Sequence, residues 1–174
     1  MTINLQNTKI SLRLPEPDDL EFLYNLENNT SNWHVSNTRM PFSKSTLQKY
    51  IENSHIDIYT SGQIRFLIIN KIDNCSIGAI DLYDFDGFHQ RAGIGIIISD
   101  HLRGQGFGSA AVSLIEEYSF SYLLLHQLYC HIEPDNKQSI ALFRKHNYKH
   151  TGTLKAWNRK QEGYSDEFIF QKLV

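Results

Sequence analysis

The 174 residues fit one domain, 1–174, and carry 17 Lys and Arg against 19 Asp and Glu, a formal net charge of -2. This balance, without a basic cluster, argues against nucleic-acid binding, and the lack of a leader-like start or an apolar run of about 18 residues predicts a cytoplasmic protein. Neither the two cysteines nor the eight histidines show metal-ligand spacing, so we expect reduced thiols and no metal.

The N-terminal half alternates strands and helices. Residues 28–42 show no clear periodicity, and we expect a mobile functional loop there, next to an acceptor pocket. The predicted elements are a strand at 10–14, a break with an N-cap at 15–19, a helix at 20–28, a helix capped by Ser43 and running to about 53, and a hairpin of strands 63–70 and 76–84.

The C-terminal half contains two strand–helix units followed by two strands. The predicted elements are a strand at 91–99, a helix at 109–122, a strand at 128–133, a helix at 136–148, and strands at 148–156 and 164–173. Together with the first half, they predict an α+β fold with a mixed central β-sheet flanked by helices.

Arg103-Gly104-Gln105-Gly106-Phe107-Gly108 lies between a predicted strand and a predicted helix. Such a turn presents free backbone N–H groups at a positively polarised helix end, which suits a phosphate-bearing ligand. A dinucleotide fingerprint would need its third glycine at Ser109, and no Gly-Lys-Ser/Thr follows for a nucleotide triphosphate loop. A plain strand–helix connection is the alternative.

The strand before this turn places Gly93, Gly95 and Ile97 on one face by its period of two. Two glycines on one face weaken a strand unless something approaches its backbone closely. The pattern therefore indicates either a ligand groove or a bulge or tight packing against a neighbour.

A second motif follows at the start of the last predicted helix. Asn136, Ser139 and Phe143 are spaced i, i+3 and i+7, so they share one helix stripe. This segment resembles the Asn-x-x-Ser/Ala-x-x-Leu-Tyr motif of the GCN5-related N-acetyltransferases (GNAT), and Arg103-x-x-Gly106-x-Gly108 resembles their acetyl-CoA signature. Segments 10–19, 33–42 and 89–92 extend the similarity to the spermidine-type and ribosomal-protein N-terminal acetyltransferase subgroups.

The resemblance implies a GNAT fold with acetyl-CoA in the splay between the fourth and fifth strands. It implies transfer of an acetyl group to a primary amine, of a small molecule or a peptide N-terminus, by direct attack on the thioester. A free strand N–H near Ile97 would stabilise the oxyanion. The implied cofactor-binding residues are Ile96, Ile97, Ile98, Arg103, Gly104, Gln105, Gly106, Phe107, Gly108, Ser109, Asn136 and Ser139.

Two departures from the family affect the expected chemistry. Phe143 replaces a tyrosine proposed as the acid for the departing thiolate, and Gly93 replaces a glutamate that accepts the proton or orders a water. Acid–base assistance is worth roughly 10²- to 10⁴-fold per group, less than the orientation of two reactants can supply, so activity can survive both losses. A non-catalytic acyl-CoA-binding module is the alternative function.

Two residues are candidates for the missing catalytic groups. Ser139 matches a serine proposed as the acid in the ribosomal-protein subgroup, or it makes an ordinary hydroxyl contact to the cofactor. Asp84 matches an acidic position of the polyamine subgroup, or it is a turn residue at a strand end. Glu133 is a further candidate for a catalytic group, and a structural role is its alternative.

Substrate-binding candidates are Trp33, Arg39, Asp84 and Gly93, with His34 and Asn37 nearby. Residues 28–42 contain no Asp or Glu, which argues against a strict polyamine enzyme and for a polar or carboxylate-bearing amine or a peptide N-terminus. Trp33 has the alternative of anchoring the loop in the core. Exposed strand edges, common in the family, are compatible with a homodimer.

Overall fold

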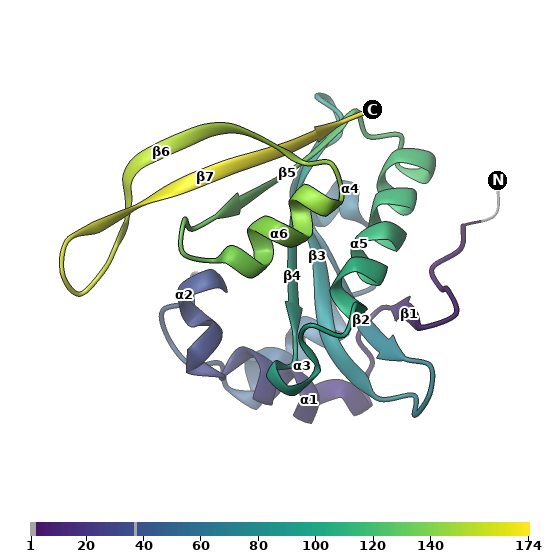
Figure 1. Ribbon diagram of the computed structural model, residues 1–174. Coiled ribbons are helices and arrows are strands. Elements are labelled where there is room, and N and C mark those ends of the chain that lie inside the picture. Colours follow the sequence, from purple (N-terminus) through teal and green to yellow (C-terminus); the bar gives the residue numbers. More distant parts are fainter. Residues whose placement is uncertain (1–2, 37) are drawn as a thin grey trace.

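The computed structural model describes residues 3–36 and 38–174, and their strands form a seven-stranded sheet (Figure 1). The order is β1-β2-β3-β4-β5-β7-β6, and all neighbours are antiparallel except β4 and β5, which run parallel. The mixed sheet expected from the sequence is confirmed. The strands are β1 (Ile10–Arg13), β2 (Ile64–Asn70), β3 (Ser76–Asp86), β4 (Arg91–Ile98), β5 (Gln127–Ile132), β6 (Lys149–Arg159) and β7 (Tyr164–Leu173).

Helices flank the sheet, and the expected cap at Ser43 is present. The Ser43 hydroxyl accepts from the Thr46 N–H at 3.1 Å, and Asn136 Oδ1 accepts from the Ser139 N–H at 3.1 Å. The helices are α1 (Leu20–Glu27), α2 (Trp33–Ser36), α3 (Lys44–Glu52), α4 (Ile58–Ser61), α5 (Phe107–Glu117) and α6 (Lys137–Lys145).

The structure differs from the sequence expectations at several boundaries. Residues 28–42 are not a plain loop, because they contain a 3-10 turn and the short helix α2. The helix expected at 109–122 begins at Phe107 and ends at Glu117, and a π-helical turn follows at Tyr118–Tyr122. The four-residue α4 was missed because one helical turn carries no periodic signal.

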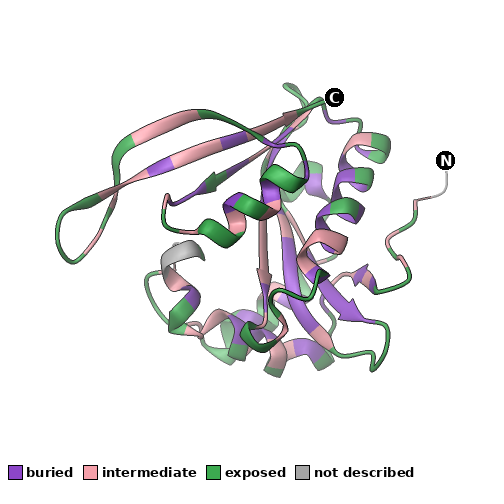
Figure 2. Cartoon of the chain, viewed as in Figure 1, coloured by how far each residue is buried: buried purple, intermediate pink, exposed green. Residues whose placement is uncertain are grey.

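The two faces of the sheet bury separate clusters of apolar side chains. Ile94 and Ile98 pack with α5 on one face, whereas Ile97 packs on the other with Leu23 of α1 and Leu47 of α3. The alternation predicted for β4 is therefore confirmed. Figure 2 shows buried residues along the central strands, while the β6–β7 hairpin is mostly intermediate or exposed.

The parallel pair β4 and β5 stays together over only a short stretch. The register runs from Arg91 opposite Gln127 to Gly93 opposite Tyr129, and the strands then diverge. On its other side β5 remains paired with β7 along its whole length, which fixes its direction. The separation leaves the C-terminal half of β4 with a free edge, as expected for the splay between the fourth and fifth strands.

Close packing accounts for one of the two β4 glycines. A Cβ atom at Gly93 would lie 2.3 Å from the ring of Tyr83, whereas one at Gly95 would lie 3.7 Å from it. Tyr83 thus occupies the space beside Gly93, and the tight-packing alternative holds at that position.

Candidate active site

A cleft of about 890 Å³ opens beside the diverging end of β4. Its walls are the last residues of β4, the glycine-rich turn with the start of α5, and one side of α6. Gln105 is the one expected cofactor residue that does not line it. The expected residues that do are Ile96, Ile97, Ile98, Arg103, Gly104, Gly106, Phe107, Gly108, Ser109, Asn136 and Ser139.

The turn leading into α5 leaves its backbone N–H groups free. Gly104 and Gly106 adopt φ values of 75° and 84°, a left-handed conformation that favours glycine. Among the described residues no oxygen accepts from the N–H groups of residues 104–109, and the first helical bond joins the Ala110 N–H to the Gly106 carbonyl at 3.1 Å. This arrangement is suited to binding a phosphate group.

Lys9, which the sequence analysis did not single out, lies against this turn. Its ammonium group donates to the Gln105 carbonyl and is 4.6 Å from the centroid of the Phe107 ring. It adds a positive charge beside the turn from a residue almost a hundred positions earlier. Nothing in the local sequence around Lys9 indicates this contact.

Arg103 braces the cleft as well as lining it. Its Nε donates to the Ile98 carbonyl at 3.1 Å, and a terminal nitrogen donates to Asn32 Oδ1 at 2.8 Å. The side chain also lies 2.8 Å from the Asp100 carboxylate. It therefore connects the end of β4 to the 3-10 turn before α2.

The register of β4 decides which of its N–H groups face the opening. The Ser99 N–H donates to a β3 carbonyl at 2.9 Å, and hydrogen-bonded positions alternate along antiparallel strands. Ile97 consequently pairs with β3, so the free N–H groups are those of Ile96 and Ile98. The sequence predicts an oxyanion donor near Ile97, and the two free N–H groups on either side of Ile97 are the candidates.

We call the cleft of about 890 Å³ the cofactor cleft. A second cavity, of about 160 Å³, adjoins it. The residues that line both are Asn32, Ile96, Ile97, Asn136 and Ser139. Ser139 thus lies where the two spaces meet, a position suited to contact both reactants. We call this second space the acceptor cavity.

Phe143 lines the acceptor cavity and is 3% exposed. Its ring meets Tyr148 edge-on, with centroids 5.0 Å apart. Tyr148 lines neither space, and burial together with the Glu116 carboxylate raises the pKa of its phenol. Tyr148 therefore does not restore the phenol that Phe143 removes from the helix.

Four carboxylates line the acceptor cavity, against one guanidinium group. They come from the end of α1, from β3, from the residue after β5 and from β7, and not from residues 28–42. The sequence signal that could have revealed such an acid is a charged residue inside an apolar strand such as β3. The carboxylates belong to Glu27, Asp81, Glu133 and Glu167.

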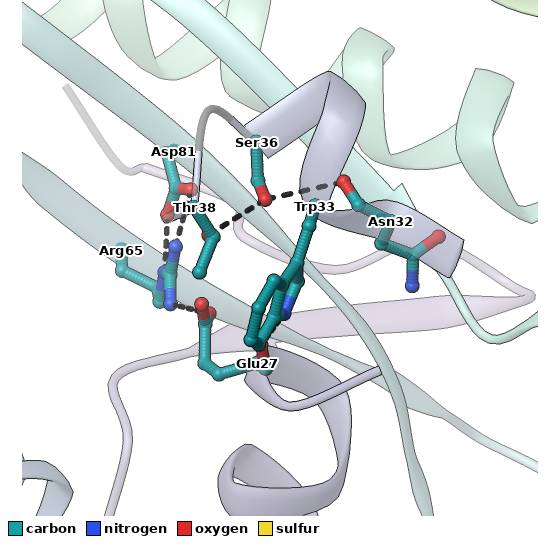
Figure 3. A network of polar contacts seen from close by, with 7 residues as sticks. All are labelled: Glu27, Asn32, Trp33, Ser36, Thr38, Arg65 and Asp81. Carbon is teal, nitrogen blue, oxygen red and sulfur yellow. Dashed lines mark hydrogen bonds and ion pairs between the residues drawn. The ribbon is translucent and has the colours of Figure 1, made fainter. Parts of the chain in front are cut away.

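Arg65 of β2 joins two of these carboxylates (Figure 3). Its Nε is 2.6 Å from Asp81 Oδ1, a terminal nitrogen is 2.8 Å from Oδ2, and another binds Glu27. Burial opposes the charge, but the Asp81 and Glu27 carboxylates hold the pKa of Arg65 well above its usual value. Arg65 thereby fixes both acids in position and balances one of their two negative charges.

The other two carboxylates have different partners. Glu133 binds the ammonium group of Lys160, which lies in the β6–β7 turn. Glu167 is 6% exposed, and its Oε2 is 3.4 Å from Nδ1 of His131. His131, which the sequence predicts near the cleft, lies on the wall of the cavity.

None of the four expected substrate residues lines either space. Trp33 is half-buried and donates from Nε1 to the Glu27 carbonyl at 2.8 Å, which fits the loop-anchoring alternative (Figure 3). Arg39 is exposed, and Gly93 is covered by Tyr83. Asn37 and the side chain of His34 lie outside the described residues.

Asp84 lies in a separate depression of about 350 Å³. Asp86 and Tyr129 line it too, and burial and the Asp84 carboxylate raise the pKa of Tyr129. His131 lines both this depression and the acceptor cavity, so the two spaces adjoin. Asp84 is therefore a neighbour of the acceptor cavity and does not line it.

Three further observations concern the described residues. Over residues 3–36 and 38–174 no three His, Cys, Asp or Glu side chains are grouped as metal ligands would be. No helix within the same residues combines the length and the apolar character that a bilayer crossing needs. The thiols of Cys75 and Cys130 are free.

Comparison with known proteins places the chain among acetyltransferases. A family model described as an acetyltransferase (GNAT) domain matches residues 9–149. A spermidine N(1)-acetyltransferase of Vibrio cholerae is 28% identical over 151 residues, covering 85% of this chain and 83% of the relative. A spermidine N(1)-acetyltransferase of Escherichia coli strain K12 is 27% identical over 148 residues, covering 83% and 75%.

A solved structure gives the same result. The spermidine N-acetyltransferase from Vibrio cholerae in complex with CoA and spermine superposes with a TM-score of 0.86 at 25% identity, covering 96% of each chain. The GNAT fold expected from the two motifs is confirmed, and spermidine-type enzymes are among the relatives. The chain therefore belongs to the GNAT acetyltransferase family, and it transfers the acetyl group of acetyl-CoA to a primary amine.

Proposed function

We propose that the acceptor is a polyamine, an amine with a second positively charged group. The observation that carries this is the set of four carboxylates on the wall of a cavity that opens into the cofactor cleft. A cavity lined in this way attracts cations and disfavours a free carboxylate. The similarity to spermidine acetyltransferases supports the same acceptor class.

The positions of the charges suggest how such a substrate lies. The reacting amine sits beside Ser139, and the chain of the substrate passes His131 toward the depression that contains Asp84. Glu27 and Asp81 are already bound to Arg65, whereas Asp84 forms no ion pair with any described residue. Asp84 therefore holds the distal ammonium group and does not take part in the chemical step.

The chemical step begins with loss of a proton, because an alkylammonium group has a pKa of about 10. His131, next to Glu167, accepts this proton. The amine then attacks the thioester carbonyl, and the N–H of Ile96 or Ile98 stabilises the oxyanion. Collapse breaks the carbon–sulfur bond, and the departing thiolate, a good leaving group because a thiol has a pKa of about 8.5, takes the proton of the Ser139 hydroxyl. The remaining extra proton of the attacking nitrogen then passes to Ser139, which leaves the amide, the CoA thiol and one proton on His131.

The test is CoA thiol release with acceptors that differ in charge. We expect kcat/KM for spermidine to exceed that for propylamine by about 10²-fold, since a second ammonium group binds a partly buried carboxylate. Equal values for the two amines would contradict the polyamine proposal. Faster turnover of a tripeptide would favour a peptide N-terminus, and CoA binding without turnover of any acceptor would favour the non-catalytic module.

Two expectations from the sequence accompany this proposal. A homodimer is supported by the exposed edge of the sheet at β6, and a related structure is described as a dodecamer of spermidine N-acetyltransferase from Vibrio cholerae. Sedimentation or light scattering measures the assembly directly. A cytoplasmic location stays a prediction.

A further inference from the structure

A chain of polar side chains runs inward from the start of α5. The Ser109 hydroxyl is 2.9 Å from Nε2 of His146, and Nδ1 of His146 is 3.4 Å from Glu116 Oε2. The Lys172 ammonium group of β7 is 2.9 Å from the same Glu116 oxygen. These four residues come from the start and end of α5, the end of α6 and the last strand.

The two middle members of this chain are buried. His146 is 9% exposed and Glu116 8% exposed, whereas Ser109 is half-buried and lines the cofactor cleft. Ser109 does not line the acceptor cavity, so it is not placed at the point of acetyl transfer. It belongs to the run of free N–H groups that we assign to the pyrophosphate of CoA.

The direction of the Ser109 hydroxyl depends on the protons of His146. A hydroxyl group donates only one hydrogen bond. When Nε2 is bare, the Ser109 proton points at it, and only oxygen lone pairs face an incoming phosphate. When Nε2 carries a proton, it donates to Ser109, and the hydroxyl proton is free to point into the cleft.

The Glu116 carboxylate disfavours the neutral tautomer of His146 that carries its proton on Nε2. A neutral ring protonated only on Nε2 would set a bare Nδ1 against the Glu116 carboxylate, two acceptors 3.4 Å apart. The groups that face His146 and Glu116 are the Ser109 hydroxyl, the Lys172 ammonium group and the phenol of Tyr148. Burial and the Glu116 carboxylate raise the pKa of Tyr148, so its phenol remains neutral.

We propose that His146 is a positioning residue that takes up a proton when CoA binds, and thereby turns the Ser109 hydroxyl toward a phosphate oxygen. The proposal rests on the assignment of the pyrophosphate to the turn before α5. Binding of CoA then tightens as the pH falls, because the complex holds one more proton than the free protein. One proton changes the affinity by at most about tenfold per pH unit.

Isothermal titration calorimetry of the whole protein with dephospho-CoA tests the proposal. This ligand lacks the 3′-phosphate, whose own second pKa of about 6 would obscure the result. Titrations at one pH in two buffers of different ionisation enthalpy measure the protons taken up. We expect uptake of up to one proton by the unchanged protein, with affinity that falls as the pH rises.

Three variants assign the proton to His146. Ser109→Ala is close to isosteric, and we expect binding about tenfold weaker with no proton uptake. In His146→Gln the side-chain amide donates to Ser109 at every pH, so binding stays strong at high pH and proton uptake is lost. His150→Gln is the matched control, because this exposed histidine contacts Thr153 on β6, and proton uptake is unchanged.

Two results would overturn the proposal: no proton uptake by the unchanged protein, or undiminished uptake by Ser109→Ala. The Gly106→Leu variant separates this failure from a wrong placement of CoA. Normal binding of dephospho-CoA by Gly106→Leu means that the phosphates lie elsewhere. Loss of binding in that variant, with no proton uptake in the unchanged protein, means that only the role of His146 is wrong.

Discussion

The cofactor cleft and the acceptor cavity meet at Ser139, yet they are built from different parts of the chain. The cofactor cleft is lined mainly by the run of residues 96–109 and by one side of α6. The acceptor cavity uses side chains from α1, β2, β3, β5 and β7. A site built from one continuous run of residues gives a motif that can be found in the sequence. A site built from side chains of separate elements gives no such motif.

The two spaces also differ in charge. Arg103, Lys137 and Lys145 line the cofactor cleft, against the single carboxylate of Asp135. The acceptor cavity has the opposite balance, with four carboxylates and one guanidinium group. The positive charges of the cofactor cleft attract a polyanionic cofactor, and the carboxylates of the acceptor cavity attract a cationic amine. This difference favours correct orientation of the two reactants.

The largest effect we expect is the loss of CoA affinity when the turn before α5 is altered. Gly106→Leu forces a side chain into a left-handed residue with φ of 84° at the head of α5, next to the Lys9 ammonium group. We expect CoA affinity to fall by more than about 10²-fold, since several N–H donors lose their alignment at once. Calorimetry or fluorescence titration with CoA measures it.

Gly163→Leu is the matched control for Gly106→Leu. Gly163 has φ of 89° in the β6–β7 turn, and a Cβ atom added there would meet no other atom within 4 Å. Both substitutions cost about 1–2 kcal/mol of backbone strain. Equal CoA affinity of the two variants would contradict the assignment of the cofactor to the turn before α5.

Removal of Arg65 is expected to damage the acceptor side selectively. Arg65→Leu leaves the Glu27 and Asp81 carboxylates without their common partner, and we expect a loss of about 3–5 kcal/mol in the free energy of unfolding. Urea denaturation measures it, with Arg91→Leu as the control. Arg91 forms an exposed pair with Asp86, worth no more than about 1 kcal/mol.

The Arg65→Leu variant should retain an intact cofactor cleft. Below its unfolding transition, the variant should bind CoA as the unchanged protein does, because Arg65 does not line the cofactor cleft. A parallel loss of CoA affinity would mean that the two spaces are not independently built.

The hydroxyl of Ser139 is expected to contribute about 10²-fold to kcat. Ser139→Ala should lower kcat by that factor and leave the affinity for CoA within a few fold. Phe143 lies one helical turn further on and lines the acceptor cavity, so Phe143→Tyr in the same chain should restore part of the rate. Thiol release measures both, and an unchanged kcat in Ser139→Ala would exclude the serine as the acid.

The smallest effect concerns the distal end of the substrate. Asp84→Asn should raise KM for spermidine by about tenfold while KM for propylamine stays the same, because only the polyamine reaches the depression beside His131. Added salt should reduce the difference between the two proteins. An equal rise for both amines would place Asp84 at the reacting amine.

Much of the fold was predictable from local patterns. The apolar alternation of β4, the cap at Ser43 and the glycine-rich turn before α5 depend on neighbouring residues, and each was found as expected. The boundaries missed were those without periodicity, such as the single turn of α4. The expected free N–H near Ile97 was narrowed to Ile96 and Ile98 only by the register with the partner strand.

The sequence by itself determined the family and the cofactor, and it predicted the residues that line the cleft, since the conformation of that contiguous backbone is dictated by glycine and capping residues. Only the tertiary structure decided the charge of the acceptor cavity. Its carboxylates lie on separate elements, so the acid-free loop at 28–42 gave no sign of them. Tyr83 beside Gly93 and Lys9 beside Gln105 are likewise contacts between distant residues, which no local pattern encodes.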